Sequence, residues 1–504
     1  MRFFACGAAV ITALSVFGAG SRALAQDVTL IARGGGLELS GTLQAFDGEF
    51  YRILSAYGPL TVDAQGVICD GPGCPGLTAP RAVIRIAGEG DPGGRILPGL
   101  IRAFADFRRL TLEVGGDATR LTDPTTGQLL AEFSFIAMPV DQAVPLLEAG
   151  QADLVIAAET PDGLGSRTLA LDALVPIVAA DNPVAEVSSA NLARVLAGEV
   201  SNWSDIGGPD MPLVLHALPP DSGLQKALGV RLGRDVKAAE VHPDLTALAA
   251  AVARDPWAIA VTGKSSIGAA KAITLTDKCG FPLLPTSLAV KAEDYPLALP
   301  IHLLTPKRRL PLMAREFLEF LSYPQAQAAI AKSGYVDRLP ERLPMTLDGL
   351  RLINAIQGAG AETTLDDLKT LVDAMDGADR LSLTFRFEDG SSTLDAASRD
   401  NLADLALLLE AGMFKDEALV LAGFSDGSGA AEANLDLSQE RAEAVAKALR
   451  DAAPTVPADR LPQVMAFGEA LPMACDETAT GRRLNRRVEL WLRPDFTKDP
   501  APGN

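Results

Sequence analysis

The segment best suited to bind a charged ligand lies near the C-terminus, where the run GFSDGSG occupies residues 423–429. Asp426 follows a strand expected over 418–422, and Arg441 lies near the start of a helix expected over 438–450. A helix N-terminus favours anions, and arginine can hold a carboxylate through two parallel hydrogen bonds. One fixed acid beside one fixed guanidinium therefore predicts a site for a zwitterion that presents an ammonium group next to a carboxylate.

The residues that follow this run extend the pattern. They are Asn434, Leu437-Ser438, Arg441-Ala442, Gly481-Arg482 and Asn485-Arg486-Arg487-Val488-Glu489. In order and spacing, the string resembles the OmpA-like peptidoglycan-binding family, over a C-terminal domain expected at 381–495. The resemblance implies an α+β fold and a peptidoglycan stem peptide as the partner.

The resemblance also implies individual roles. The expected peptidoglycan-binding residues are Asp426, Arg441, Asn434, Ser425, Arg486 and Arg487. Asp426 and Arg441 match the pair that binds diaminopimelate in the family. Of the two neighbouring arginines, one is expected near the site and one in a structural role. Phe424 stands where the family has histidine, an exchange that predicts a changed affinity or peptide preference.

The same run also matches the Gly-x-Ser-x-Gly pattern of serine hydrolases. In the hydrolase fold the histidine follows the serine along the chain, but the last histidine here is His302, well before Ser425. The match is therefore interpreted as accidental. No nucleophile and base arrangement and no metal-ligand spacing stands out, so the sequence predicts a binding protein that is not an enzyme and has no cofactor or metal.

Residues 80–340 alternate between strand and helix patterns, which indicates α/β units around a largely parallel sheet. The buried strand expected at Leu169–Val178 and the run ANLARVLAGEVSNWSDIGG at 190–208 resemble phosphate-type periplasmic substrate-binding proteins. This resemblance implies a two-lobed periplasmic-binding-protein fold of type 2, which closes on a ligand by hinge motion.

The ligand of this domain is less well defined by the sequence. The expected contacts are Gly90, Gly93, Ser222 and Gly223. The family's Ser-Gly-Thr is Ser-Gly-Leu here, no arginine lies near 216–218, and Glu89 and Asp91 stand where an oxyanion would bind. A small anion or zwitterion, a cation, or no small ligand all remain open. The glycines at 88, 90 and 93 also spell a dinucleotide-binding pattern, for which a tight turn is the preferred interpretation.

The N-terminus predicts export. A positive Arg2, an apolar stretch over 3–17 and Ala23-Leu24-Ala25 are typical of a signal peptide at 1–25, cleaved after Ala25. The stretch is shorter than a membrane-spanning helix needs. We expect a periplasmic protein associated with the cell wall or outer membrane. Residues 26–78 predict a small β domain, 341–380 a connector with one helix, and 496–504 a loose tail.

The cysteines and the net charge limit the possible disulfides and the possible partners. The turn-rich loop between Cys69 and Cys74 predicts a disulfide, as expected for an exported chain. Cys279 and Cys475 either form a second disulfide or remain buried thiols. A formal net charge of −19 argues against nucleic acid as a partner. The expected partners are the stem peptide, a small anion or zwitterion, and an envelope protein.

Overall fold

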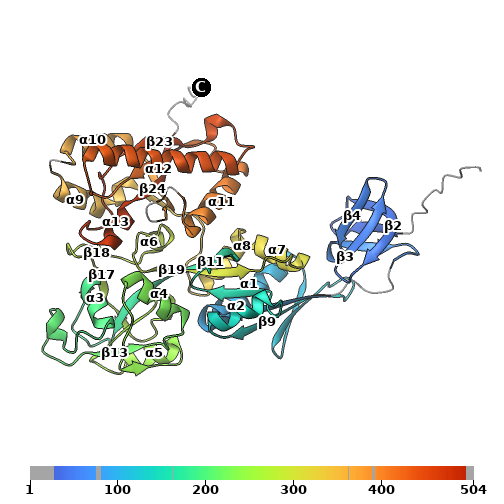
Figure 1. The fold of residues 1–504 in the computed structure, drawn as a ribbon, viewed down its shortest axis with the longest axis horizontal. Coiled ribbons are helices and arrows are strands. Elements are labelled where there is room, and N and C mark those ends of the chain that lie inside the picture. Colours follow the sequence, from blue (N-terminus) through green and yellow to red (C-terminus); the bar gives the residue numbers. More distant parts are fainter. Residues whose placement is uncertain are drawn as a thin grey trace, which may run out of the picture. The chain divides into compact units, whose positions relative to one another are not determined.

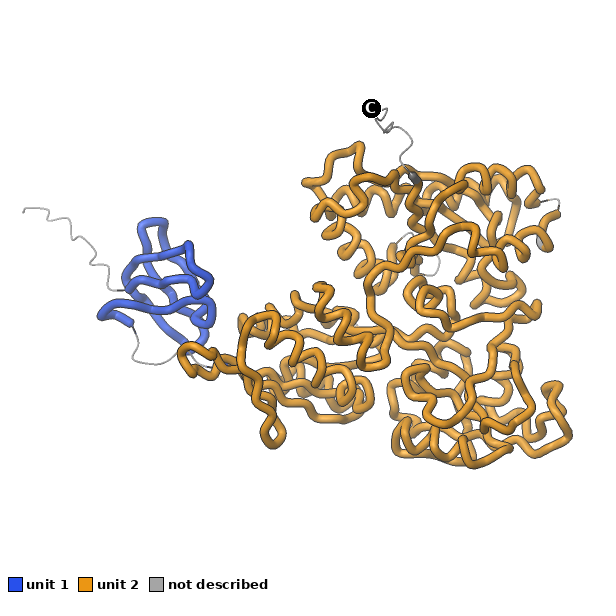
Figure 2. The backbone as a smooth tube through the Cα atoms, turned by 180° about the vertical axis from the view of Figure 1, so that it is seen from behind, with its two compact units in different colours: residues 1–81 blue, residues 82–504 orange. Residues whose placement is uncertain are grey.

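The computed structural model describes residues 28–494, apart from 75–80, 162, 361, 389, 390 and 392. The predicted signal peptide at 1–25 and the tail at 496–504 lie outside the described residues. The chain divides into two compact units, residues 1–81 and residues 82–504 (Figure 2).

The first unit is a five-stranded antiparallel sheet in the order β4-β3-β2-β1-β5. Its strands are β1 (Val28–Ala32), β2 (Glu38–Phe46), β3 (Phe50–Ser55), β4 (Gly58–Asp63) and β5 (Val67–Asp70). Val28, Leu30, Tyr51 and Ile53 form its buried core. The Cys69–Cys74 disulfide predicted from the loop composition is present.

The second unit begins with the substrate-binding domain, whose long sheet has the order β14-β13-β15-β11-β19-β10-β6-β9-β8-β7. These strands are β6 (Ala82–Gly88), β7 (Thr111–Gly115), β8 (Ala118–Thr122), β9 (Leu129–Ala137), β10 (Leu154–Ala157), β11 (Gly165–Val178), β13 (Val214–Ala217), β14 (Glu240–Val241), β15 (Ala258–Gly263) and β19 (Ala298–Thr305). The expectation of a largely parallel sheet was wrong. β6 runs parallel to β9 and β10, but β19 is antiparallel to both β10 and β11.

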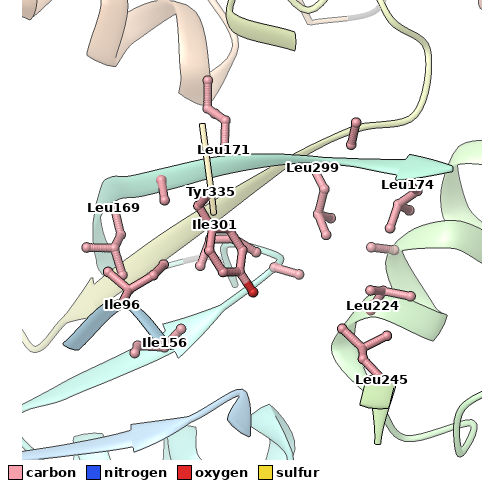
Figure 3. Packing of buried hydrophobic residues seen from close by; sticks show 14 of the residues in the cluster. Ile96, Ile156, Leu169, Leu171, Leu174, Leu224, Leu245, Leu299, Ile301 and Tyr335 are labelled. Atoms are coloured by element: carbon pink, nitrogen blue, oxygen red, sulfur yellow. The ribbon is translucent and has the colours of Figure 1, made fainter. Parts of the chain in front are cut away.

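The antiparallel pair β11 and β19 connects the two lobes. Residues 165–173 of β11 pair with β19, and residues 174–178 pair with β15 of the second lobe. The last ten residues of β11 form an apolar run that only Asp172 interrupts, which suits a strand buried on both faces. The apolar cluster around it draws on both lobes, from Ile96 and Ile156 to Leu224 and Leu245 (Figure 3).

The helices of this domain contribute apolar side chains to the clusters that cover the sheet. They are α1 (Gly90–Phe107), α2 (Val140–Glu148), α3 (Ser189–Leu196), α4 (Gly223–Leu232), α5 (Leu245–Val252), α6 (Ser287–Lys291), α7 (Leu312–Phe320) and α8 (Pro324–Lys332). A small sheet of β12 (Glu186–Ser188), β17 (Thr274–Thr276) and β18 (Pro282–Leu283) completes the second lobe, and β16 (Lys271–Ala272) pairs with β11. α1 includes Pro92 near its start, because proline is tolerated in the first turn of a helix.

The C-terminal domain is a five-stranded sheet with helices on both faces (Figure 1). Its order β20-β21-β24-β22-β23 comprises β20 (Arg342–Pro344), β21 (Asp379–Phe385), β24 (Arg487–Pro494), β22 (Glu417–Phe424) and β23 (Gln463–Ala466). α11 (Ala396–Glu410) and α12 (Ala431–Ala452) pack on one face, and α9 (Gly349–Gly358) and α10 (Leu365–Ala374) on the other. α13 (Ala479–Asn485) precedes β24.

The segment 341–380 differs from the predicted connector with one helix. It supplies an edge strand, β20, and two helices, α9 and α10, to the C-terminal domain. Leu368 and Leu371 of α10 share a core with Trp491 of β24. The short apolar pattern of α9 and the glycine and alanine residues after it concealed the second helix.

The two domains of the second unit are tied together covalently and by buried charges. A disulfide joins Cys279, near β17, to Cys475 of the C-terminal domain. Asp294, after α6, bonds Arg380 at 2.7 Å and Arg386 at 3.0 Å. The sequence had left free thiols open as an alternative for this cysteine pair, and the structure shows the disulfide.

Candidate functional site

A cavity of 350 Å³ opens in the C-terminal domain beside α12. Its lining residues come from the segment after β21, from α12 and from the region of α13, and they are Arg386, Phe387, Glu388, Ser391, Leu437, Glu440, Arg441, Arg483 and Arg486. Four guanidinium groups face two glutamates in this lining, so the pocket favours a ligand that carries at least one carboxylate. We refer to it below as the arginine pocket.

Asp426 is not a lining residue of the arginine pocket, but it forms an ion pair with one of the guanidinium groups of that lining. The Oδ2 atom of Asp426 is 2.9 Å from Nη1 of Arg486, and its Oδ1 atom accepts the backbone N–H of Ser428 at 3.0 Å. Burial raises the pKa of the Asp426 carboxyl, but the hydrogen bonds from Arg486 and Ser428 outweigh it and hold the pKa below its usual value. The group is therefore an anion at neutral pH.

Arg441 contributes a guanidinium group to the lining whose hydrogen bonding is incomplete. Its Nη1 atom is buried and has no hydrogen-bond partner among the described residues, while its guanidinium carbon lies 6.0 Å from the centre of the Phe387 ring. Burial and the neighbouring Arg486 lower the pKa of Arg441, but an arginine remains charged. A buried charged donor without an acceptor is costly, and a ligand carboxylate would remove that cost.

The helix that carries Arg441 starts earlier than the sequence predicted. α12 begins at Ala431, so Arg441 lies in its middle and not near its first turn. Because the helix dipole acts only within the first turn, it does not contribute to anion binding at Arg441. The anion-binding capacity of the pocket comes from the guanidinium groups themselves.

Four of the six predicted contact residues lie outside the lining of the arginine pocket, namely Asp426, Asn434, Ser425 and Arg487. Asn434 is buried and donates to Glu469 at 2.8 Å, and the Ser425 hydroxyl is buried without a hydrogen-bond partner in the described part of the chain. Arg487 is fully buried and bonds Glu489 at 2.7 Å. Of the two arginines in the motif, Arg486 lines the pocket and Arg487 is structural.

Phe424 points away from the arginine pocket. It lies in the core formed by α9, α10 and the opposite face of the sheet, with the Arg487 guanidinium 4.3 Å from its ring centre. The exchange of histidine for phenylalanine therefore changes the packing around Arg487 and adds no contact to the pocket.

We expect Phe424→Leu to leave sedimentation with peptidoglycan unchanged while it lowers the free energy of unfolding by about 1–3 kcal/mol, through lost packing and a lost cation–π contact. Urea unfolding and co-sedimentation with purified sacculi measure the two effects. A folded variant that no longer pellets would contradict this placement of Phe424.

The sequence did not identify Arg386, Phe387 or Arg483 as pocket residues. Arg386 and Phe387 directly follow the apolar strand β21, and the arginine next to that apolar run was the one available signal. Arg483 lies next to the motif but three residues before Arg486, and only the turn of α13 brings both to the same cavity.

A second cavity, of 560 Å³, lies between the lobes of the substrate-binding domain. Five carboxylates line it, from Glu89, Asp91, Asp172, Asp221 and Asp244. The rest of the lining is mainly apolar, and it includes Leu224, Leu245, Leu299, Ile301 and Tyr335 (Figure 3). No lysine or arginine lines the cavity among the residues that the structure describes.

Of the four residues predicted to contact a ligand in this cleft, two belong to its lining and two do not. Gly90 and Ser222 line it. Gly93 instead permits close packing, since a Cβ atom there would lie 2.1 Å from the Phe135 ring. The backbone N–H of Gly223, which begins α4, is taken by the Glu89 carboxylate at 3.0 Å. Burial raises the pKa of Glu89 to about 7.

The glycine pattern at 88, 90 and 93 is a tight strand-to-helix turn. Gly88 has a φ of 119°, and a Cβ atom there would lie 2.2 Å from the carbonyl oxygen of Ile156. These backbone constraints explain why glycine occurs in this turn, so the pattern does not require a bound dinucleotide as its explanation.

Comparisons with known proteins match the central domain and the C-terminal domain to family models. The OmpA family model matches residues 386–486, and the PBP superfamily domain model matches residues 131–324. The chain is similar to the probable lipoprotein YiaD of Escherichia coli, with 36% identity over 108 residues, which are 21% of this chain and 47% of YiaD. It is also similar to the phosphate-binding protein PstS of Bacillus subtilis, with 27% identity over 201 residues, which are 38% of this chain and 64% of PstS.

Solved structures with a similar arrangement include two phosphate-transport proteins. A receptor from Vibrio cholerae has a TM-score of 0.40 at 22% identity, covering 50% of this chain and 99% of its own. A putative phosphate ABC transporter substrate-binding protein from Clostridium perfringens has a TM-score of 0.42 at 16% identity. The match covers 51% of this chain and 99% of that protein. The chain spans less than two thirds of YiaD and of PstS. From the family matches, this chain combines a PBP superfamily domain in its middle with an OmpA family domain at its C-terminus.

Proposed function

We propose that this chain is a periplasmic binding protein that holds peptidoglycan non-covalently through its C-terminal domain, residues 381–495, and so tethers a ligand-binding domain, residues 80–340, to the cell wall. The OmpA family match supports wall binding, and the PBP superfamily match supports a ligand-binding role for the central cleft. Both families are binding proteins, which supports a role without catalysis.

One observation carries the wall-binding proposal. In the pocket next to the Asp426–Arg486 ion pair, the buried Nη1 atom of Arg441 has no hydrogen-bond partner in the described part of the chain. The free end of a diaminopimelate side chain has an ammonium and a carboxylate on one carbon. The carboxylate would accept hydrogen bonds from Arg441, and the ammonium would lie toward the anionic Asp426. Arg483 and Arg386 would stabilise further carboxylates of the stem peptide.

A second candidate function is the solute-binding component of a transporter for phosphate or another oxyanion. The similarity to PstS of Bacillus subtilis favours it, and Ser222 lines the cleft as a phosphate site would require. The five carboxylates of the cleft argue against it, because they repel a dianion.

The location of the protein is part of the proposal. The two families support the cell envelope, and we propose that residues 1–25 are a cleaved signal peptide and that an envelope protein is a further partner. Every helix in the described part of the chain is too short or too polar to cross a bilayer. We also propose that residues 26–78 form a separate domain, since the structure places 1–81 in its own compact unit.

We expect the tripeptide L-Ala-γ-D-Glu-meso-diaminopimelate to release the protein from purified sacculi. The same tripeptide with lysine in third place should not, because lysine ends in an ammonium without the adjacent carboxylate that Arg441 would bind. Co-sedimentation at increasing peptide concentration measures the release. Equal competition by the two peptides, or binding to sacculi that neither peptide affects, would contradict diaminopimelate recognition.

A further inference from the structure

We propose that the cleft of the central domain binds an organic cation with an apolar body, of the size and charge of a polyamine, and excludes phosphate. The proposal rests on the ligand-binding role proposed above for this domain, and it assigns the chemical class of the ligand. The wall-binding role of the arginine pocket is independent of it.

The charge of the cleft is the first observation. The lining contains five carboxylates and, in the described part of the chain, no basic side chain. Nearby cations offset only part of this excess. Arg95 is 3.8 Å from Asp91, and Lys226 bonds Asp141 at 2.9 Å, which lies outside the lining. Several negatively charged carboxylates in a partly desolvated cavity attract a cation and repel an anion.

The second observation is that a carboxylate of the protein already occupies the anion position. α4 begins at Gly223, and the free N–H groups at such a helix start bind anions. The Glu89 Oε1 atom accepts the Gly223 N–H at 3.0 Å, and a Cβ atom on Gly223 would lie 2.1 Å from that oxygen. An incoming phosphate would have to displace Glu89 from this helix and would then meet the other acids of the cleft.

The third observation is the apolar part of the lining. Leu224 and Leu245 of the second lobe lie across the cavity from Leu299, Ile301 and Tyr335 (Figure 3). The Tyr335 hydroxyl donates to Asp91 at 2.6 Å, so this acid is held at the edge of the apolar surface. Methylene groups between two ammonium centres would contact the leucines while the ammonium groups reach the carboxylates. The cavity volume of 560 Å³ has room for such a molecule.

The pH dependence of binding follows from the surroundings of Glu89. Burial raises its pKa to about 7, the Gly223 N–H and Lys226 on α4 lower it, and Asp141 of α2 and Asp221 raise it. Burial also raises the pKa of Asp172 to about 6. A cation prefers the ionised forms, which predominate above these pKa values. Binding should therefore tighten as the pH rises from 6 to 8, by about tenfold for one group with a pKa near 7, and should release protons at pH 7.

The test is calorimetric titration of the full mature chain with spermidine, with 1,8-octanediol as the neutral probe and inorganic phosphate as the anion. We expect saturable spermidine binding that is about tenfold tighter at pH 8 than at pH 6, and proton release when the titration is repeated in buffers of different ionisation enthalpy. Glu89→Gln keeps an acceptor for the Gly223 N–H but removes the charge. It should weaken spermidine binding and flatten its pH dependence.

Asp235→Asn serves as the matched control, because Asp235 is an exposed acid outside the cleft lining. It should bind spermidine as the wild type does. Phosphate binding, absence of saturable spermidine binding, or equal effects of Glu89→Gln and Asp235→Asn would each overturn the proposal. Sedimentation of the same preparations with sacculi reports wall binding separately, so a failure of one proposal is distinguishable from a failure of the other.

Discussion

Replacing Arg441 or Asp426 with alanine should abolish co-sedimentation of the mature chain with purified sacculi. Arg441→Ala removes the guanidinium whose buried Nη1 atom has no hydrogen-bond partner among the residues that the structure describes. Asp426→Ala removes the anion proposed to face the ammonium group, and it frees Arg486 from a 2.9 Å ion pair. Removing one partner of a desolvated charged contact costs about 2–5 kcal/mol, which is a factor of about 30 or more in affinity.

Two further variants separate this effect from a general loss of charge. Arg441→Lys keeps the positive charge but lacks the planar fork that holds a carboxylate through two hydrogen bonds, so we expect binding to be weakened strongly. Arg450→Ala removes an exposed arginine from the last turn of the same helix, and it should pellet like the wild type. Undiminished pelleting of both alanine variants at 426 and 441 would contradict the assignment of the site.

Glu489→Gln should lower the free energy of unfolding of the second unit by about 3–5 kcal/mol at pH 7. The Glu489 side chain has no exposed surface and lies 2.7 Å from Arg487, 2.7 Å from Arg351 and 3.4 Å from Arg380. It also accepts the indole N–H of Trp491 at 3.0 Å. Neutralising the carboxylate would leave three buried guanidinium groups without their shared anion.

Urea unfolding followed by circular dichroism measures this loss, and Glu432→Gln, an exposed glutamate at the start of α12, is the control. Burial would raise the pKa of Glu489, but the three arginines hold it far below its usual value of 4.5. The stabilisation is therefore fully present above about pH 4.5 and is lost progressively as the pH falls below it. A change of less than about 1 kcal/mol would show that the cluster is not needed for stability.

The buried charges extend from this cluster to the domain interface. Arg380 joins Glu489 to Asp294 of the substrate-binding domain, and Arg386 joins Asp294 to the arginine pocket. Arg386 also donates to the backbone oxygen of Glu293 at 3.1 Å. The arginine pocket and the interface between the domains thus share a side chain.

Local sequence patterns predicted helices and strands well where a segment has a single clear hydrophobic periodicity. The strand at Leu169–Val178 and the one helix expected within 341–380 have clear patterns, and the structure has them as β11 and α10. The strand of the motif and the turn that holds Asp426 were also predicted, because their spacing is local. The helix α9 was missed because the glycine and alanine residues at 358–361 indicated a connector.

The roles of side chains were harder to predict because they depend on which face of an element is covered. Phe424 and Asp426 are two residues apart, yet Phe424 packs against α9 and α10 while Asp426 bonds Arg486 beside the pocket. The neighbours Arg486 and Arg487 differ in the same way, since β24 begins at Arg487 and buries it. The sequence holds no direct signal that 341–380 would cover this second face.

The most direct test of the account is a crystal structure of the mature protein soaked with the meso-diaminopimelate tripeptide. We predict density for the free end of diaminopimelate in the arginine pocket, with its carboxylate within hydrogen-bonding distance of Arg441 and its ammonium group near Asp426. A fully soaked crystal with an empty arginine pocket, or with the peptide bound elsewhere, would contradict it.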